Sequence, residues 1–284
     1  MDKRIIDLYD DFTHGGMNRR AFLDRLAALA GSTAAAAALL PVLQNNYAQA
    51  QTIPENDSRI VAAMVDIPGA PGLKGYLVKP KSGGKLPAVL VIHENRGLNP
   101  HIKDVTRRMA AEGFVALGLD YLAPMGGTPA DEDKGRDMIG QLKQPAVVAY
   151  GKAAVAYLKG LPDSNGKVGA IGFCWGGGAV NNLAVADPDL SAGVAYYGGQ
   201  PKAEDVPKIK AALMLHYAGL DERINAGIPA FEAALKQAGK TYEIHTYEGA
   251  NHAFNNDTNE ARYDKEAADL AWKRTVGFLK KQLA

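Results

Sequence analysis

The chain has 284 residues, of which 47% are hydrophobic and 22% charged, so it can bury a sizeable core and is neither disordered nor fibrous. Its 32 basic and 31 acidic residues are mixed without long blocks of one sign, which excludes a nucleic-acid footprint and favours a small-molecule partner. Cys174 is the only cysteine, which excludes an internal disulfide and a cysteine-based metal cluster.

Residues 1–50 differ in character from the rest of the chain. Arg19 and Arg20 precede a weakly hydrophobic alanine- and leucine-rich run and a small-residue stretch, AQA, that ends at Ala50. This order is typical of a twin-arginine export signal and predicts a periplasmic protein. The alternative is an uncleaved amphipathic helix, packed on the domain or on a neighbouring subunit, in a cytoplasmic protein. Because the apolar run is short, we expect no stable membrane span and a mature domain over 51–284.

From residue 57 onward, strand-like and helix-like patterns alternate. Continuous apolar runs indicate strands buried on both faces of a sheet, and apolar residues at helical spacing indicate helices packed against it. The stretch that holds Pro124 and Pro129 is predicted as a loop. This alternation predicts an α/β fold with a mainly parallel central sheet and helices on both faces. In chain order we expect strands over 59–67, 73–80, 86–94, 114–120, 167–173, 191–197, 211–217 and 241–247, and helices over 102–113, 145–160, 177–186, 228–239 and 266–284.

The sequence GFCWG at 172–176 joins a predicted strand directly to a predicted helix. Glycines two residues before and two after the central residue permit the strained backbone of a nucleophile elbow, with cysteine where serine is usual. The helix N-terminus beside the sulfur favours the thiolate. We therefore predict that Cys174 is a nucleophile. The alternative is a buried cysteine that acts as a small hydrophobic residue.

A nucleophile on this fold needs an orienting acid and a histidine base, which follow it in that chain order. Asp221 follows a predicted strand in LHYAGLD, and His252 follows the last predicted strand in EGANHAF. Both loops belong to the edge of the sheet at which Cys174 lies. The order predicts a Cys-His-Asp triad, against the alternatives that Asp221 caps a helix and His252 is a turn residue. His14 lies in the leader, so it has a weaker claim than His252.

The elbow GFCWGG, the GLD and NHAF loops and Glu94 in VIHENRGLN resemble the dienelactone hydrolase family, or carboxymethylenebutenolidases, over nearly all of 57–284. The stretch HENRGLNP is most similar to a long-leader or exported branch. The resemblance implies an α/β-hydrolase fold that opens lactones or esters without a cofactor, and we expect no metal. It also implies that Glu94 contacts the resting thiol and that the backbone N–H groups of Asn95 and Trp175 form the oxyanion hole.

One departure from that family concerns the substrate. In the dienelactone enzyme itself, arginines that hold the substrate carboxylate follow segments that here read LDYLAP and NHAFNND, and neither stretch contains arginine. Arg96 or Arg223 could supply a cation from elsewhere, or could form a structural ion pair. We therefore expect small activated esters or lactones as substrates and leave open whether dienelactone is accepted.

Alternatives are open for the role of Glu94 and for the kind of activity. A carboxylate beside Cys174 would keep the sulfur protonated until substrate binds, unless Glu94 only braces its loop. A thiol-based redox sensor or binding protein on the same scaffold is the alternative to an enzyme, and so is a promiscuous hydrolase acting on phosphotriesters or carbon–halogen bonds. The natural substrate, the oligomeric state and the cleavage of the leader are left open, with a homo-oligomer as one alternative.

Overall fold

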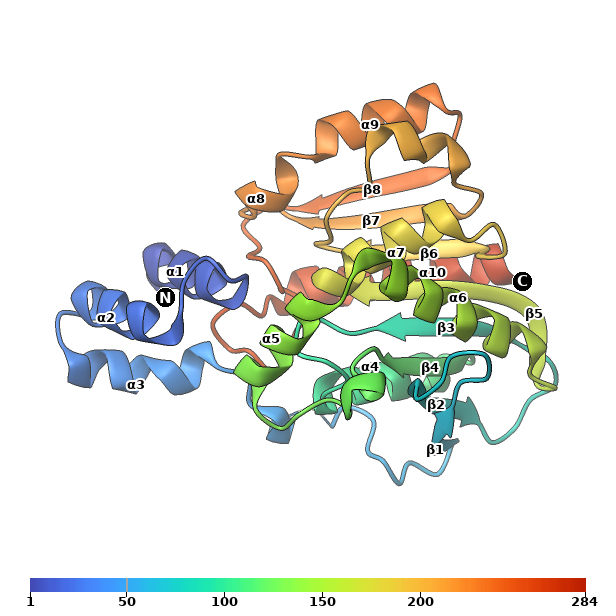
Figure 1. Cartoon of the computed structure of the whole chain (residues 1–284), viewed down its shortest axis with the longest axis horizontal. Coiled ribbons are helices and arrows are strands. Elements are labelled where there is room, and N and C mark those ends of the chain that lie inside the picture. Colours follow the sequence, from blue (N-terminus) through green and yellow to red (C-terminus); the bar gives the residue numbers. More distant parts are fainter. Residues whose placement is uncertain (50) are drawn as a thin grey trace.

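The computed structural model describes residues 1–49 and 51–284, so Ala50, at the end of the predicted AQA cleavage site, lies outside the described residues. Three N-terminal helices lie beyond the carboxyl ends of the parallel strands of an α/β domain (Figure 1). Each predicted strand and helix of that domain is present to within a few residues. The helices are α1 (Lys3–Thr13), α2 (Arg19–Ala30), α3 (Thr33–Leu43), α4 (Pro100–Ala111), α5 (Glu132–Gln141), α6 (Gln144–Gly160), α7 (Trp175–Ala186), α8 (Glu222–Asn225), α9 (Ile228–Gln237) and α10 (Lys265–Leu283), with 3-10 turns η1 (Tyr47–Gln49), η2 (Ala123–Met125) and η3 (Ala203–Lys208).

The strands form one eight-stranded sheet in the order β1-β2-β4-β3-β5-β6-β7-β8. Strand β2 runs antiparallel to both of its neighbours, and the strands from β4 to β8 pair in parallel. This arrangement confirms the predicted α/β-hydrolase fold with its mainly parallel sheet. The strands are β1 (Ile60–Asp66), β2 (Lys74–Pro80), β3 (Leu86–Ile92), β4 (Val115–Asp120), β5 (Ser164–Phe173), β6 (Ala192–Tyr196), β7 (Ala212–Ala218) and β8 (Tyr242–Tyr247).

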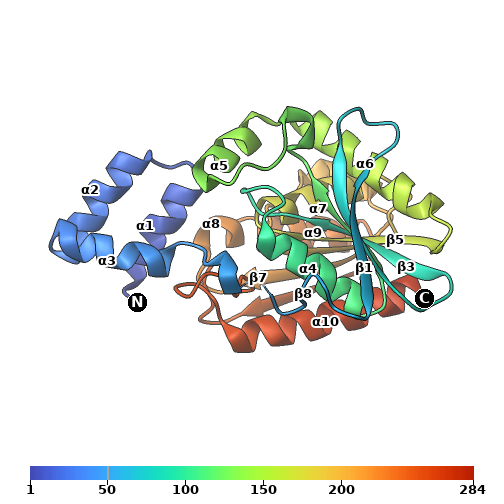
Figure 2. The ribbon, with the colours of Figure 1, turned by 90° about the horizontal axis from the view of Figure 1, so that it is seen from below.

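Helices cover both faces of the sheet, which explains why its central strands are apolar without alternation. Helices α4 and α10 pack on one face, and α6, α7 and α9 pack on the other (Figure 2). Each face buries a large apolar cluster; Ile171 of β5 belongs to the first and Ala170 to the second. Strand β5 therefore lies between two packed layers, and Cys174 follows directly after its last residue.

The N-terminal helices form a small unit with its own core. Tyr9, Phe12, Phe22 and Leu26 belong to an apolar cluster that joins the three helices, and Phe12 stacks on Phe22 with ring centroids 4.5 Å apart. Within the described residues, no individual helix has both the length and the hydropathy needed to cross a membrane. Helix α2 and the segment Thr33–Gln49 meet that test only when taken together, and a bend of 111° separates them.

Two features of the fold differ from the sequence-based expectation. Helix α5 occupies a stretch for which no helix is predicted, because EDKGRDMIGQ has too few apolar residues to show a helical period. The Asp131 side chain caps it by accepting from two backbone N–H groups. Helix α4 begins at Pro100, two residues before the predicted start, because the Asn99 side chain caps it and Pro100 fits its first turn.

Candidate active site

Cys174 lies between the end of β5 and the start of α7 with φ 55° and ψ −115°, a conformation that side chains rarely adopt. The flanking glycines make this turn possible. A Cβ on Gly172 would lie 2.2 Å from the carbonyl oxygen of Gly176, and a Cβ on Gly176 would lie 2.4 Å from that of His93. The Cys174 N–H donates to the carbonyl of Tyr196 at 3.0 Å. The backbone thus has the strained strand–turn–helix form that the GFCWG motif predicts.

Asp221 and His252 lie next to each other in the loops that follow β7 and β8. The Nδ1 of His252 donates to Oδ2 of Asp221 at 2.5 Å, and both residues are about 95% buried, with exposed fractions of 5% and 6%. Asp221 Oδ1 also accepts from the N–H of Ile224, so the same carboxylate caps α8. The Nε2 of His252 is buried without a hydrogen-bond partner, and a ring nitrogen of His252 lies within 4.8 Å of the Cys174 sulfur.

A second histidine, His14 from the end of α1, also contacts the thiol. Its Nε2 lies 3.3 Å from Cys174 Sγ, and its ring meets that of His252 edge-on at a centroid distance of 4.8 Å. Its place in the predicted leader gives His14 a weaker claim from sequence than His252. The sequence does contain a pattern that indicates a packed helix here: Ile5, Tyr9 and Phe12 form an apolar face. An export signal does not need such a face ahead of its arginines.

The two titratable groups at the centre of the site have opposite pKa shifts. Burial by itself raises the pKa of the Cys174 thiol, but the nearby His252 and His14 outweigh it and lower that pKa to about 6. Burial disfavours the charged form of His252, but Asp10, the thiolate and the hydrogen bond to Asp221 raise its pKa to about 10. Both shifts favour transfer of the thiol proton to a neighbouring imidazole.

The residues that the family resemblance adds lie around the same thiol. Glu94, Asn95 and Cys174 line one small cavity. Oε2 of Glu94 accepts from the Asn256 side chain at 3.0 Å, and Oε1 is buried without a partner. Trp175 is the first residue of α7, where a backbone N–H has no carbonyl partner inside the helix.

A cavity of about 820 Å³ opens above the thiol, lined by Cys174, Trp175 and Tyr197 and by residues of α5, α7 and the N-terminal region. Arg223 also lines it, with a side chain that is 47% exposed and lies 3.9 Å from Asp10. Arg96 is not available to a substrate in the same way, because it is buried and ion-paired with Glu132. Arg136 lines the same cavity but is ion-paired with Asp133 at 3.1 Å, so Arg223 is the more available of these arginines.

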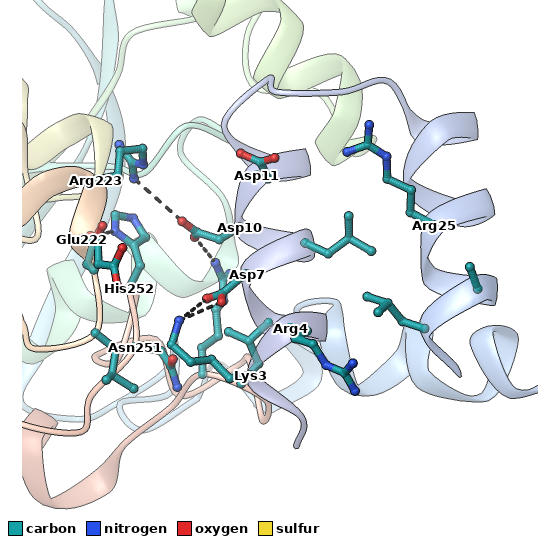
Figure 3. Close-up of a pocket in the computed structure, with 17 residues that line it drawn as sticks. Lys3, Arg4, Asp7, Asp10, Asp11, Arg25, Glu222, Arg223, Asn251 and His252 are labelled. Atoms are coloured by element: carbon teal, nitrogen blue, oxygen red, sulfur yellow. Dashed lines mark hydrogen bonds and ion pairs between the residues drawn. The ribbon is translucent and has the colours of Figure 1, made fainter. Parts of the chain in front are cut away.

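A second cavity of about 940 Å³ separates the N-terminal helices from the loops that carry Asp221 and His252. Figure 3 shows Asp10 reaching from α1 toward Arg223, beside His252. The donor atoms of His14, Cys174 and His252 all lie within 4.8 Å of one another. We assign no metal to this cluster, because the family resemblance implies hydrolysis without one.

A sequence model of the dienelactone hydrolase family matches residues 73–283 of the chain. The chain belongs to the dienelactone hydrolase family. It is 33% identical over 239 residues to a "Putative carboxymethylenebutenolidase" of Methylorubrum extorquens, which covers 78% of this chain and 82% of that protein. It is 32% identical over 219 residues to a "Probable 2-oxo-3-(5-oxofuran-2-ylidene)propanoate lactonase" of a Bradyrhizobium species, over 72% of this chain and 88% of that protein.

The solved structures agree with this assignment. A "Putative Dienelactone Hydrolase" from Klebsiella pneumoniae superposes with a TM-score of 0.71 at 28% identity, over 78% of this chain and 98% of that one. The chain is thus a dienelactone hydrolase-like hydrolase that acts on ester bonds. Residues 1–31 match a separate sequence model, described as YqhI-like, so His14 lies outside the part matched to the dienelactone hydrolase family.

Proposed function

We propose that this protein hydrolyses small activated esters or lactones with Cys174 as nucleophile, His252 as base and Asp221 as the orienting acid. The observation that carries the proposal is the state of His252. Its Nδ1 is held by the Asp221 carboxylate, its Nε2 is buried without a hydrogen-bond partner, and a ring nitrogen of His252 lies within 4.8 Å of the Cys174 sulfur. This is the relation between base, orienting acid and nucleophile that acyl transfer requires.

The reaction follows from these positions. The thiolate of Cys174 attacks the carbonyl carbon, and His252 gives its proton to the departing oxygen as the thioester forms. His252 then takes a proton from water, which attacks the thioester and releases the acid. Backbone N–H groups of Asn95 and Trp175 would hold the oxyanion, a contribution of about 3 kcal/mol for each donor in comparable sites.

Glu94 is proposed to restrain the resting thiol. Its unpartnered Oε1 lines the same small cavity as Cys174, which favours a role in the site over a loop brace alone. A negative charge there opposes a second one on sulfur. If so, Glu94→Gln speeds alkylation of Cys174 by iodoacetamide near neutral pH while it lowers ester turnover. Alkylation at the wild-type rate or below contradicts this role.

The cavity favours a small substrate that carries a carboxylate. Arg223 lines the cavity and has a weak ion-pair partner in Asp10, so its guanidinium can reach an anionic group. One relative is named for a lactone that carries a propanoate group. We propose an unsaturated lactone with a carboxylate as the substrate class. Arg223→Gln then raises KM for such a lactone far more than for a neutral p-nitrophenyl ester.

The test is a substrate panel of short p-nitrophenyl esters, carboxylated and neutral lactones, and phosphotriesters. Wild-type protein is compared with Cys174→Ala and with the control His245→Ala, a histidine on β8 whose ring pairs with Glu243. The proposal expects ester and lactone turnover in wild type and control and none in Cys174→Ala. Full turnover in Cys174→Ala, or turnover of phosphotriesters alone, contradicts it.

Periplasmic export stays a prediction, and so does its cytoplasmic alternative. The N-terminal sequence of the protein from fractionated native cells separates the two. A periplasmic chain that begins near Gln51 supports export and cleavage. A cytoplasmic chain that begins at Met1 supports retention of the N-terminal helices.

A further inference from the structure

We infer that His14 is a second catalytic base, supplied to the active site by the N-terminal helices, which takes the thiol proton of Cys174 and leaves His252 to serve the departing oxygen and water. The inference rests on the proposed function. It starts from the hydrogen-bond contact of 3.3 Å between His14 Nε2 and Cys174 Sγ. The dienelactone hydrolase match begins at residue 73, so this contact comes from outside that family's own sequence.

The tautomer of His14 follows from its other ring nitrogen. Nδ1 lies 2.7 Å from the backbone carbonyl oxygen of Asp10. A carbonyl oxygen can only accept a hydrogen bond, so Nδ1 carries the proton. The neutral ring therefore presents the lone pair of Nε2 to the Cys174 thiol. In this state His14 accepts a proton from sulfur and cannot donate one to it.

His252 is oriented by the same logic from the opposite side. Its Nδ1 donates to Asp221, so its Nε2 also faces inward without a proton when the ring is neutral. Two imidazole nitrogens thus converge on a thiol that has one proton to give. Because His14 has the hydrogen-bond distance to sulfur and His252 Nε2 is left unpartnered, the geometry divides the two tasks between them.

The proton count closes over one turnover. The S–H bond of Cys174 breaks, its electron pair stays on sulfur and its proton binds Nε2 of His14. The thiolate forms the new carbon–sulfur bond, and the departing oxygen takes the proton of the His252 imidazolium. Water then loses a proton to His252 and adds to the thioester, whose carbon–sulfur bond breaks to return the thiolate and release the acid. The His14 imidazolium gives its proton back to the sulfur, which restores the starting state. The sum is ester plus water to acid plus alcohol.

Several contacts fix the end of α1 against the domain, so His14 is held at the thiol. The side chain of Asn95 donates to the carbonyl of Thr13 at 2.7 Å. Arg136 of α5 lies over the Phe12 ring at 4.7 Å. Gly15, with φ 85°, lets the chain turn away immediately after His14. Asn95, which follows Glu94 in the active site, thus helps to position His14 through the neighbouring Thr13.

The charged groups that face His14 and Cys174 come from several elements. Asp10 lies on α1 and Arg223 on α8, while Arg262 and His252 lie in the segment after β8 and Glu94 follows β3. Of these groups, His252 lowers the pKa of the Cys174 thiol, as His14 does. These groups are the same in wild type and in a His14 variant, so the difference between two pH profiles isolates His14.

The test is the pH dependence of Cys174 alkylation by iodoacetamide in the full chain, between about pH 5 and pH 10. His14→Ala removes the base, and His14→Asn keeps a donor for the Asp10 carbonyl but cannot accept the thiol proton. We expect both variants to move the alkylation midpoint upward from about pH 6 by about one pH unit or more, which slows alkylation at pH 6 by roughly fivefold or more. Added imidazole should restore the rate in His14→Ala. His245→Ala is the matched histidine control and should leave the profile unchanged.

Alkylation and ester turnover separate the failure of this inference from the failure of the proposed function. A profile that does not move in either His14 variant, with α1 still protected from hydrogen exchange, overturns the inference even if esters are cleaved. A profile that moves and is restored by imidazole supports it even if no ester is cleaved, in which case the proposed function fails alone. If His14→Ala loses the protection of α1 from hydrogen exchange, the alkylation profile of His14→Asn decides between these outcomes.

Discussion

The α/β domain and the N-terminal helices hold their parts of the active site in different ways. The domain sandwiches β5 between two apolar clusters, and the strained backbone of Cys174 is fixed on every side. The N-terminal unit has a cluster of seven buried side chains and meets the domain through polar contacts, such as those of Asn95 with Thr13 and of Asp10 with Arg262. The domain therefore holds its catalytic residues in a rigid geometry. The N-terminal unit supplies His14 and the charge of Asp10, and loss of its few polar contacts or its small core would withdraw both from the site.

The largest effect is expected in the domain, where the proposed triad lies. Cys174→Ala or His252→Ala should lower kcat for ester hydrolysis on the order of 10^6-fold, because either change removes the whole nucleophilic route. Asp221→Asn should lose less, on the order of 10^4-fold, since the base survives without its orientation. Steady-state turnover of a p-nitrophenyl ester measures all three. A small and equal loss of kcat in all three variants would contradict the proposed triad.

The elbow glycines test how rigidly the domain is packed. Gly176→Ala places a Cβ 2.4 Å from a backbone carbonyl oxygen and should destabilise the domain by several kcal/mol. Gly178→Ala in the same helix meets its nearest atom at 3.5 Å and should leave stability unchanged or slightly raised. Thermal unfolding of both variants checks this. Similar melting temperatures would mean that the elbow yields more readily than the packing implies.

The sequence predicts the domain well, because its patterns are set by local physics. Short unbroken apolar runs bounded by turn residues indicate strands covered on both faces, and the GFCWG turn has few other conformations. The chain order of nucleophile, acid and histidine then points to Asp221 and His252, which the structure brings together in a hydrogen bond. Each of these inferences needs only a few neighbouring residues and the topology of the sheet.

The apolar face of α1 indicates a folded helix, but the sequence does not place His14 at the thiol, because that position depends on how a separate unit docks. An arginine pair followed by an apolar run has the composition of an export signal whether or not it folds into helices. Helix α5, which touches that unit through Arg136, is hidden for a related reason, since it is stabilised by its cap and by contacts from distant segments. Contacts between units leave no periodic trace in either partner.

A change in the small core should separate the two regions. Phe22 is 2% exposed and stacks on Phe12, so Phe22→Ala should cost the N-terminal unit about 3 to 5 kcal/mol, more than so small a core can lose. Hydrogen exchange should then rise throughout α1 to α3 while β3 and β5 stay protected. Leu29→Ala, at an exposed position of the same helix, is the control. Loss of protection in the central strands as well would show that the two regions unfold as one.

The smallest effect concerns the charge that α1 brings to His252. Asp10 is the strongest of the influences that raise the pKa of His252, so Asp10→Asn should lower that pKa from about 10. The alkaline limb of the pH profile of kcat/KM should move down by about one unit, equivalent to about 1.4 kcal/mol. Asp7→Asn, whose carboxylate pairs with Lys3 at an exposed site, is the control. An unchanged alkaline limb would mean that Asp10 does not act on His252.

The most direct test of the central claim is the mass of the protein caught during turnover. Asp221→Asn, mixed with excess p-nitrophenyl acetate and quenched in acid, should gain one acetyl group, because slow deacylation lets the thioester accumulate. Peptide mapping should place that group on Cys174, and hydroxylamine should remove it. An acetyl group on any other side chain, or turnover with no covalent intermediate in the variant, would contradict the claim that this hydrolase works through the thiol of Cys174.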